Sequence, residues 1–174
     1  DEDFHEITTF LALGAITGGD VVVRNTAPQN FPLIDRTFAK FGVQITHEGG
    51  WSHARRTGPL KVQTPFTSNV LTKVEAAPWP YFPVDLLPIF IALGVRAEGN
   101  AMFWNKVYDG ALGWTGELSK FGAHVFSADL EAPAGDTGDD VVLLSRLVTQ
   151  PPQVLHPRDL ITRCSGRLRL IWPR

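Results

Sequence analysis

An internal repeat is the feature that most restricts how this chain of 174 residues can fold. The matching segments lie 80 positions apart without a gap: residues 10–14 and 90–94, Gly19 and Gly99, and residues 40–43 and 120–123. A fixed period indicates one supersecondary unit that is used more than once, because a single such unit cannot bury its apolar face alone. The sequence therefore predicts two similar units that pack against each other.

Each copy alternates between helical and strand patterns. Apolar residues at helical spacing, such as Phe31, Ile34 and Phe38, indicate helices, whereas β-branched or alternating stretches indicate strands. In the first copy we expect helices at 5–16 and 31–41 and strands at 20–25, 43–46, 51–56 and 60–64. In the second copy we expect helices at 85–95 and 111–121 and strands at 74–77, 101–107 and 123–126. The expected fold class is α/β (α+β), with units about 80 residues long.

The sequence predicts a folded region at residues 1–128, with one unit at about 1–70 and the next at about 71–128. Five acidic residues and no Lys or Arg lie in 129–140, and six arginines with one acid lie in 146–174. We therefore expect residues 129–174 to be a divergent acidic linker followed by an arginine-rich tail, with candidate strands at 141–144 and 168–172. This tail does not continue the repeat.

Composition excludes several classes of protein. The 16 Lys+Arg and 18 Asp+Glu leave a net charge of −2, which argues against a nucleic-acid binder, and 44% hydrophobic residues argue against disorder. The sequence contains no stretch of 18 apolar residues without a charge, so it does not predict a membrane span. The single Cys164 excludes an internal disulfide and a cysteine-based zinc site, and the five histidines show no metal-ligand spacing, so we expect neither metal nor cofactor.

The N-terminus suggests where the chain belongs. It is acidic and lacks the order of charges and apolar residues that a signal peptide shows, so we expect a cytoplasmic protein. It also lacks an initiator Met, and we therefore expect the chain to be part of a longer one.

Residues 75–86 read Glu-Ala-Ala-Pro-Trp-Pro-Tyr-Phe-Pro-Val-Asp-Leu. This segment resembles the Pro-x-Pro-x-Phe-Pro-x-Asp signature of the UDP-N-acetylglucosamine 1-carboxyvinyltransferases, which are enolpyruvyl transferases. Residues 5–11, 106–109 and 117–124 are similar to neighbouring segments of that family, so the resemblance covers about residues 4–128.

The resemblance implies a fold and a reaction. Each half of the family's inside-out barrel has three β-α-β-α-β-β units, of which this chain would hold two units of one half. The family transfers enolpyruvyl from phosphoenolpyruvate to the 3-hydroxyl of UDP-N-acetylglucosamine in peptidoglycan synthesis, and so serves cell-wall biogenesis, cell shape and cell division. The cations for phosphoenolpyruvate and the reactive cysteine belong to the other half. The resemblance thus implies both substrates and the missing half as partners, and an isolated chain that is inactive.

Asp85 matches the aspartate of the signature, and the resemblance implies that it contacts the sugar 3-hydroxyl and helps to deprotonate it. The alternative is a plain N-cap, because Asp85 lies at an expected helix start after Pro83. The counterpart of Asp85 one unit earlier is His5, so capping at this position does not require aspartate.

Val107 and Tyr108 are the other expected substrate-binding residues. The resemblance implies that the backbone of Val107 meets the sugar nucleotide and that Tyr108 is an aromatic near the substrate, although Val107 could equally be an ordinary strand end. Lys73 and Lys106 are candidate neighbours of the diphosphate or solvated surface residues. Cys164 lies in the unmatched tail and is interpreted as an incidental thiol.

Three alternative functions stay open at this point. The first is the sister enolpyruvyl transferase that acts on shikimate 3-phosphate, which the signature at residues 79–85 disfavours. The second is a binding module that holds a uridine-diphosphate sugar without catalysis, and the third is a structural fragment that binds no ligand.

Overall fold

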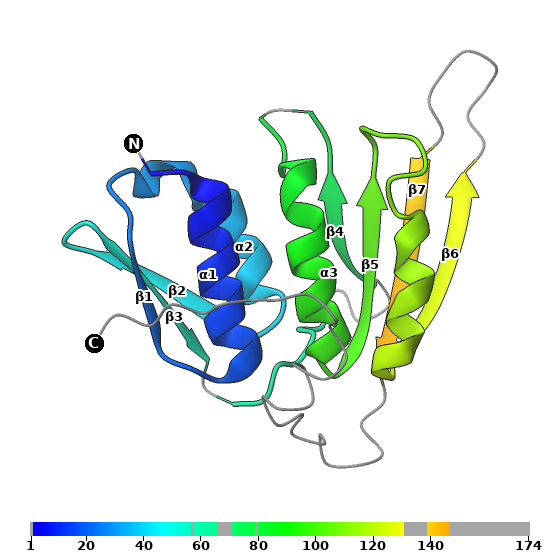
Figure 1. Ribbon diagram of the computed structural model, residues 1–174, viewed down its shortest axis with the longest axis horizontal. Coiled ribbons are helices and arrows are strands. Elements are labelled where there is room, and N and C mark those ends of the chain that lie inside the picture. The colour runs from blue at the N-terminus through cyan, green and yellow to red at the C-terminus, as the bar shows by residue number, and fades with distance from the viewer. Residues whose placement is uncertain (1, 57, 66–70, 79, 131–138, 147–174) are drawn as a thin grey trace, which may run out of the picture.

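The computed structural model of the protein describes residues 2–56, 58–65, 71–78, 80–130 and 139–146. Within these ranges the chain forms two neighbouring units, each with helices on one face of a small sheet (Figure 1). Helices and sheets mix as expected, so the predicted α/β class is confirmed.

The first unit contains two helices, one 3₁₀ turn and a three-stranded sheet. In chain order its elements are α1 (Phe4–Thr17), β1 (Val21–Arg24), η1 (Pro28–Asn30), α2 (Pro32–Ala39), β2 (Val43–Glu48) and β3 (Trp51–Arg56). The Asp3 side chain caps α1 by accepting a hydrogen bond from the backbone N–H of His5 at 2.8 Å. Gly18 ends the helix in the left-handed region, with φ of 72°, where glycine has no Cβ to clash.

The second unit contains one α-helix, two 3₁₀ helices and a four-stranded sheet. Its elements are β4 (Thr72–Ala76), η2 (Val84–Leu86), α3 (Leu87–Arg96), β5 (Gly99–Asn105), η3 (Gly113–Phe121), β6 (His124–Leu130) and β7 (Asp139–Arg146). The strand order is β4-β5-β7-β6, in which β4 and β5 are parallel and β7 is antiparallel to both of its neighbours.

The two sheets share one topology. The order β1-β3-β2 corresponds to β5-β7-β6, with the last strand of each unit in the middle and antiparallel to its neighbours. Gly42 and Gly122 both take positive φ, 76° and 79°, between a helical segment and a strand. Gly14 and Gly94 both lie inside a helix against a strand. The pair of Gly19 and Gly99 differs, because Gly99 has a positive φ of 113° and Gly19 does not.

Aromatic side chains join the two units into one core. Phe38 and Phe41 from the first unit meet Phe90 of α3, with ring centroids 4.8 and 6.3 Å apart. Phe41 also stacks on Phe103 of β5 at 6.2 Å, and all four side chains are fully buried. Because each buried phenylalanine contributes roughly 1.5–3 kcal/mol, this cluster makes the units mutually dependent.

The structure differs from the sequence-based boundaries in three places. The segment at 111–121 forms a 3₁₀ helix over 113–121 rather than an α-helix, and 60–64 contributes only an isolated bridge between Lys61 and Glu98. The expected boundary at residue 128 falls inside β6, and β7 then adds a further strand to the same sheet. Residues 147–174, with Cys164 and the candidate strand at 168–172, lie outside the described residues.

Membrane insertion finds no support among the described helices, since none combines the length and the apolar character needed to cross a bilayer.

Candidate functional site

Two loops that carry the expected site residues leave the same edge of the second sheet. Strands β4 and β5 run parallel and end together, with Ala76 opposite Asn105 and the Lys106 N–H donating to the Ala76 carbonyl at 3.1 Å. The chain after β4 leads to Asp85 in η2, and the chain after β5 carries Val107 and Tyr108. In open α/β sheets the edge beyond the carboxyl ends of parallel strands is the common place for a ligand.

Asp85 performs no capping role in the described structure. The N-cap positions of η2 and α3 are Pro83 and Leu86, and neither helix has a side-chain cap hydrogen bond. The Asp85 side chain is 68% exposed, and its carboxylate is therefore available to a ligand. The N-cap alternative from the sequence thus has no hydrogen bond to support it.

His5 is a site residue that sequence reasoning used only as a comparison. Its Nε2 lies 3.9 Å from Asp85 Oδ2, and its Nδ1 lies 3.0 Å from Asp3 Oδ1. Hydrogen bonds from the backbone N–H and then the side chain of His5 hold the pKa of Asp3 below its ordinary value. The available signal was the repeat itself, because His5 and Asp85 are counterparts 80 positions apart.

A buried asparagine shapes the loop that carries Val107 and Tyr108. Asn105 is fully buried, and its Oδ1 accepts hydrogen bonds from the backbone N–H groups of Val107 at 3.0 Å and Tyr108 at 3.4 Å. Asp140 of β7, also buried, accepts from the Leu112 N–H at 3.1 Å. The N–H of Val107 is thus occupied within the chain, whereas the Tyr108 side chain is 55% exposed.

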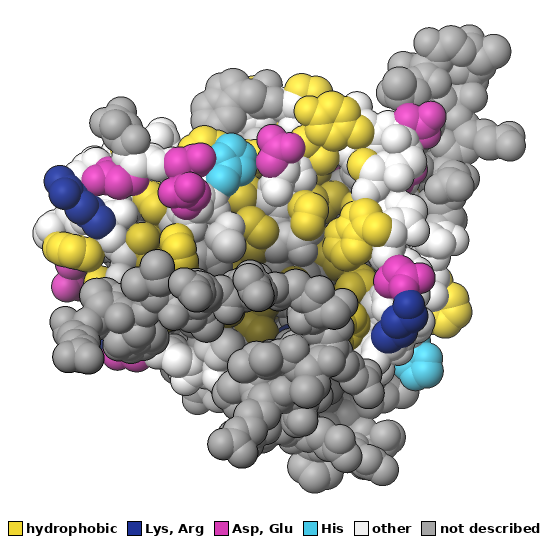
Figure 2. Space-filling view, in the orientation of Figure 1, with side chains coloured by type: hydrophobic (Ala, Val, Ile, Leu, Met, Phe, Trp, Pro, Cys, Tyr) yellow, Lys and Arg dark blue, Asp and Glu magenta, His cyan; other side chains and the backbone are white. Residues whose placement is uncertain are grey.

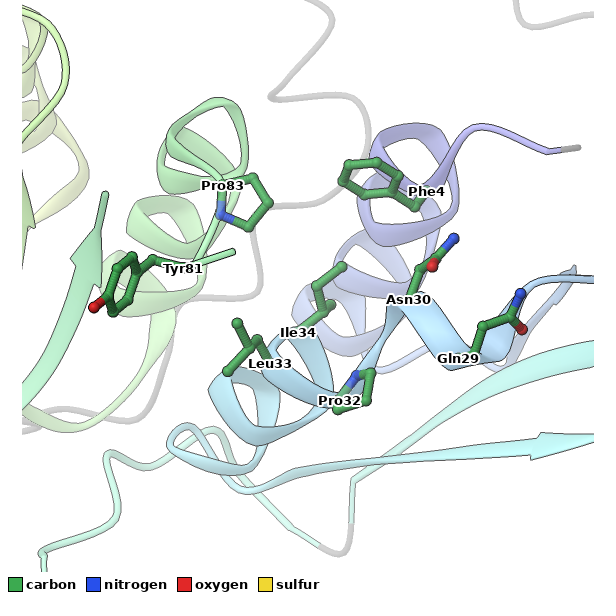
Figure 3. A pocket seen from close by; sticks show the side chains of 8 residues that line it. All are labelled: Phe4, Gln29, Asn30, Pro32, Leu33, Ile34, Tyr81 and Pro83. Carbon is green, nitrogen blue, oxygen red and sulfur yellow. The ribbon is translucent and has the colours of Figure 1, made fainter. Parts of the chain in front are cut away.

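An open, mostly apolar pocket of about 330 Å³ lies between the two units at this end. Its lining residues are Phe4, Gln29, Asn30, Pro32, Leu33, Ile34, Tyr81 and Pro83. The rings of Phe4 and Pro83 stand on either side of the space, and Ile34 points up between them from α2 (Figure 3). Pro83 belongs to the signature segment, two residues before Asp85, and Phe4 adjoins His5, although neither Asp85 nor His5 itself is among the lining residues.

Acidic side chains and a histidine lie at this end of the molecule. In Figure 2, acidic side chains and a histidine gather along the upper edge, where α1 and α3 begin, while hydrophobic side chains occupy the face below. An apolar hollow with a few polar groups at its rim is the usual form of a small-molecule site.

Lys73 and Lys106 are engaged with the sheet rather than with the pocket. Lys106 Nζ lies 2.6 Å from Glu75 Oε1, and Lys73 also pairs with Glu75. Both ammonium groups lie over the Trp104 ring, at 4.7 and 4.4 Å from its centroid. Lys106 and then Lys73 hold the pKa of Glu75 below its ordinary value. These contacts favour the surface interpretation over that of diphosphate neighbours.

A second polar cluster has the residue types of a hydrolase triad but no access for a substrate. His47 Nε2 lies 2.9 Å from Asp35 Oδ2, and its Nδ1 lies 2.6 Å from Ser52 Oγ. Ser52 is fully buried and also accepts a hydrogen bond from Asn25 at 2.8 Å. The cluster therefore ties the first sheet to α2. No group of three or more potential metal ligands occurs among the residues that the structure describes.

Comparison with known proteins identifies the family of the chain. The family model of EPSP synthase (3-phosphoshikimate 1-carboxyvinyltransferase) matches residues 2–135. The chain is similar to the UDP-N-acetylglucosamine 1-carboxyvinyltransferase of Borreliella burgdorferi, with 28% identity over 127 residues, 73% of this chain and 30% of that protein. It is also similar to the protein of the same name from Chlorobium luteolum, with 32% identity over 120 residues, 69% of this chain and 26% of that protein.

The chain thus spans 30% or less of the length of these two relatives. The family match nevertheless covers most of the chain, from before α1 to beyond β6. From its sequence, topology and family match, this chain belongs to the EPSP synthase family of carboxyvinyl (enolpyruvyl) transferases.

Proposed function

We propose that this chain is the part of a UDP-N-acetylglucosamine enolpyruvyl transferase that binds the sugar nucleotide. The observation that carries the proposal is the exposed, uncapped Asp85 beside an apolar pocket of about 330 Å³. The names of the relatives and the segment at residues 75–86 favour UDP-N-acetylglucosamine over shikimate 3-phosphate as the acceptor.

Asp85 is the base in this proposal. It accepts the proton of the sugar 3-hydroxyl, whose oxygen bonds to the phosphate-bearing carbon of phosphoenolpyruvate while an acid protonates the methylene carbon. Loss of a proton from that carbon then restores the double bond as the C–O bond to phosphate breaks and phosphate leaves. A well-placed general base contributes roughly 10²–10⁴ in rate. Because the Val107 N–H is bonded to Asn105, Val107 meets the ligand through its carbonyl oxygen, and the exposed Tyr108 ring covers an apolar face of the ligand.

The proposal places the chain in cytoplasmic peptidoglycan synthesis, and thereby in cell-wall biogenesis, cell shape and cell division. The cations around phosphoenolpyruvate come from residues outside this chain, in the other half of the enzyme. We therefore expect that the isolated chain binds the sugar nucleotide but does not complete the transfer.

Calorimetry with UDP-N-acetylglucosamine tests this function. The chain should bind the nucleotide sugar, and Asp85→Ala should weaken binding roughly tenfold or more, because hydrogen bonds to a charged group contribute about 1.5–3 kcal/mol. Asp20→Ala is the matched control, since Asp20 is also an exposed aspartate paired with a histidine, His53 of β3, but it precedes β1 and does not line the pocket.

Three outcomes discriminate the alternatives. Binding of shikimate 3-phosphate in place of the nucleotide sugar would support the sister transferase. Absence of binding to either compound would contradict the proposal and leave a structural fragment. Phosphate release from phosphoenolpyruvate by the chain alone would show that the transfer is complete without the rest of the enzyme.

A further inference from the structure

Two counterparts of the repeat meet at the proposed site. Helices α1 and α3 correspond in the repeat, lie in contact, and begin at the same end of the molecule (Figure 1). When two equivalent helices start side by side, equivalent positions near their starts face each other. His5 and Asp85 are such a pair, and His5 Nε2 lies 3.9 Å from Asp85 Oδ2.

Asp3 determines how the His5 ring presents its nitrogens. Asp3 Oδ1 lies 3.0 Å from His5 Nδ1 and also accepts the His5 backbone N–H at 2.8 Å. These hydrogen bonds favour ionised Asp3, and an ionised carboxylate only accepts hydrogen bonds. In a neutral ring the proton must therefore sit on Nδ1, which leaves the Nε2 lone pair directed toward Asp85.

The surroundings keep the ring in this place. The His5 ring stacks on Phe4 with centroids 4.0 Å apart, and its side chain is only 36% exposed. Asp85 is 68% exposed, so its carboxylate has room to rotate toward either His5 or a ligand. A separation of 3.9 Å is longer than a hydrogen bond, and such contacts often shorten only when the substrate is bound.

We propose that His5 is a positioning residue that acts on the acceptor hydroxyl only through Asp85: its Nε2 receives the proton that Asp85 takes from that hydroxyl, and the imidazolium so formed holds the Asp85 carboxylate in place. This inference rests on the proposed role of Asp85 as the base. The hydroxyl O–H bond breaks as the proton moves to Asp85 Oδ2, and that proton then moves to His5 Nε2. The products of the two steps are an oxygen nucleophile, a restored Asp85 carboxylate and an imidazolium between two carboxylates. Asp3 stabilises that positive charge.

The protonated nitrogen of neutral His5 is the decisive observable. Nitrogen-15 NMR of the imidazole rings in the unmodified 174-residue chain, at a pH where His5 is neutral, should show Nδ1 protonated and Nε2 bare. Asp20→Ala should leave this pattern unchanged, because Asp20 contacts His53 instead. A neutral His5 that carries its proton on Nε2 would overturn the proposal, since Nε2 could then not accept a proton from Asp85.

Addition of UDP-N-acetylglucosamine separates this inference from the proposed function. We expect the His5 Nε2 resonance to shift on binding in the unmodified chain, and the shift to be lost in Asp85→Asn. If amides of residues 106–112 respond to the ligand but Nε2 does not, the role of His5 is wrong although the function stands. If no resonance responds while Nδ1 is protonated, the proposed function fails and the arrangement of Asp3, His5 and Asp85 stands.

Discussion

Asp85 is a charged residue that contributes little to the stability of the fold. It lies in a single 3₁₀ turn and caps no helix in the described structure, and most of its side-chain surface is exposed to solvent. Surface carboxylates of this kind contribute little to folding, because their ion pairs are screened by water. The position of Asp85 in the signature segment, without a stabilising contact to account for it, is what the proposed role in ligand chemistry rests on.

The first prediction separates these two roles of Asp85. The substitution Asp85→Asn should leave the melting temperature within about 1 °C of the unmodified chain, because a surface change away from a cap alters stability by less than about 0.5 kcal/mol. Thermal unfolding followed by circular dichroism checks this expectation. A drop of several degrees would show that the carboxylate is a structural cap after all, whereas Asp3→Ala, which removes the side-chain cap of α1, should lower the melting temperature.

The sequence contained part of this site. Asp85 was inferred from the signature segment, and Val107 and Tyr108 from the resemblance at residues 106–109; the structure brings the two segments to one edge of the β4–β5 pair. The contact between His5 and Asp85 was missed, because the repeat was used to compare positions rather than to ask which equivalent positions meet. The pocket could not be predicted either, since its lining combines α1, η1, α2 and the loop before η2.

At the scale of elements, two glycines let helices approach the strands closely. A Cβ on Gly94 would lie 2.9 Å from Phe103 Cζ, and one on Gly14 would lie 2.7 Å from Val21 Cγ2. Both separations are shorter than an ordinary van der Waals contact, and Phe103 is fully buried. The equivalent glycines thus have an equivalent function, which is close packing of a helix on its own sheet.

The second prediction concerns this packing. Gly14→Ala and Gly94→Ala should each destabilise the chain, because overpacking costs about 1–3 kcal/mol and outweighs the roughly 1 kcal/mol that alanine gains over glycine in a helix. Urea unfolding measures both free energies. Gly116→Ala in η3 is the control, since a Cβ there meets nothing within 4 Å and should have a small effect. Stability unchanged in both helix variants would contradict the close approach.

The third prediction uses the pH dependence of the Glu75 ion pairs on β4. Lys106 and Lys73 lower the pKa of Glu75 below its ordinary value of 4.5, so the pairs stabilise the folded chain above pH 4.5 and lose that effect as pH falls through the lowered pKa. The stability difference between the unmodified chain and Glu75→Gln should therefore shrink as the solution is acidified below pH 4.5.

Urea midpoints between pH 3 and pH 7 measure this trend, and Glu48→Gln at the exposed end of β2 reports the general effect of losing one carboxylate. A difference for Glu75→Gln that stays constant over this range, or that grows toward acid, would contradict the role of the two lysines.

Most elements could be predicted from local patterns, and the exceptions have physical causes. The sequence of residues 60–64 predicts a strand, but consecutive backbone N–H groups donate to different elements. Val62 donates to the Glu98 carbonyl at 2.8 Å, and Gln63 donates to the Lys40 carbonyl at 2.8 Å. Neither partner pairs with more than an isolated stretch of this segment, so the segment forms a bridge at Lys61 and Glu98 rather than a ladder. The 3₁₀ geometry of η3 could not be read from apolar spacing alone, and its sequence contains two glycines that weaken an α-helix.

At the scale of the whole molecule, the two units are tied together rather than merely adjacent. The phenylalanine cluster joins them, and Lys40 Nζ of the first unit donates a hydrogen bond to the Lys73 carbonyl of the second at 2.6 Å. The pocket lies at the same junction, so the proposed site depends on the packing of both units. The repeat thus extends to the topology, because β7 takes in the second sheet the central place that β3 takes in the first, although the residues that precede β7 do not match the first copy in sequence.

The measurement that tests the central claim most directly is amide chemical-shift mapping of the 174-residue chain with UDP-N-acetylglucosamine. The proposed function predicts that the largest changes cluster at residues 80–86 and 106–112 and at the pocket lining near Phe4. Asp20→Ala should give the same map, and Asp85→Ala should reduce it at equal ligand concentration. Changes confined to the outer face of the second sheet around Trp104, or no changes at saturating nucleotide sugar, would contradict the claim that this end of the molecule binds the sugar nucleotide.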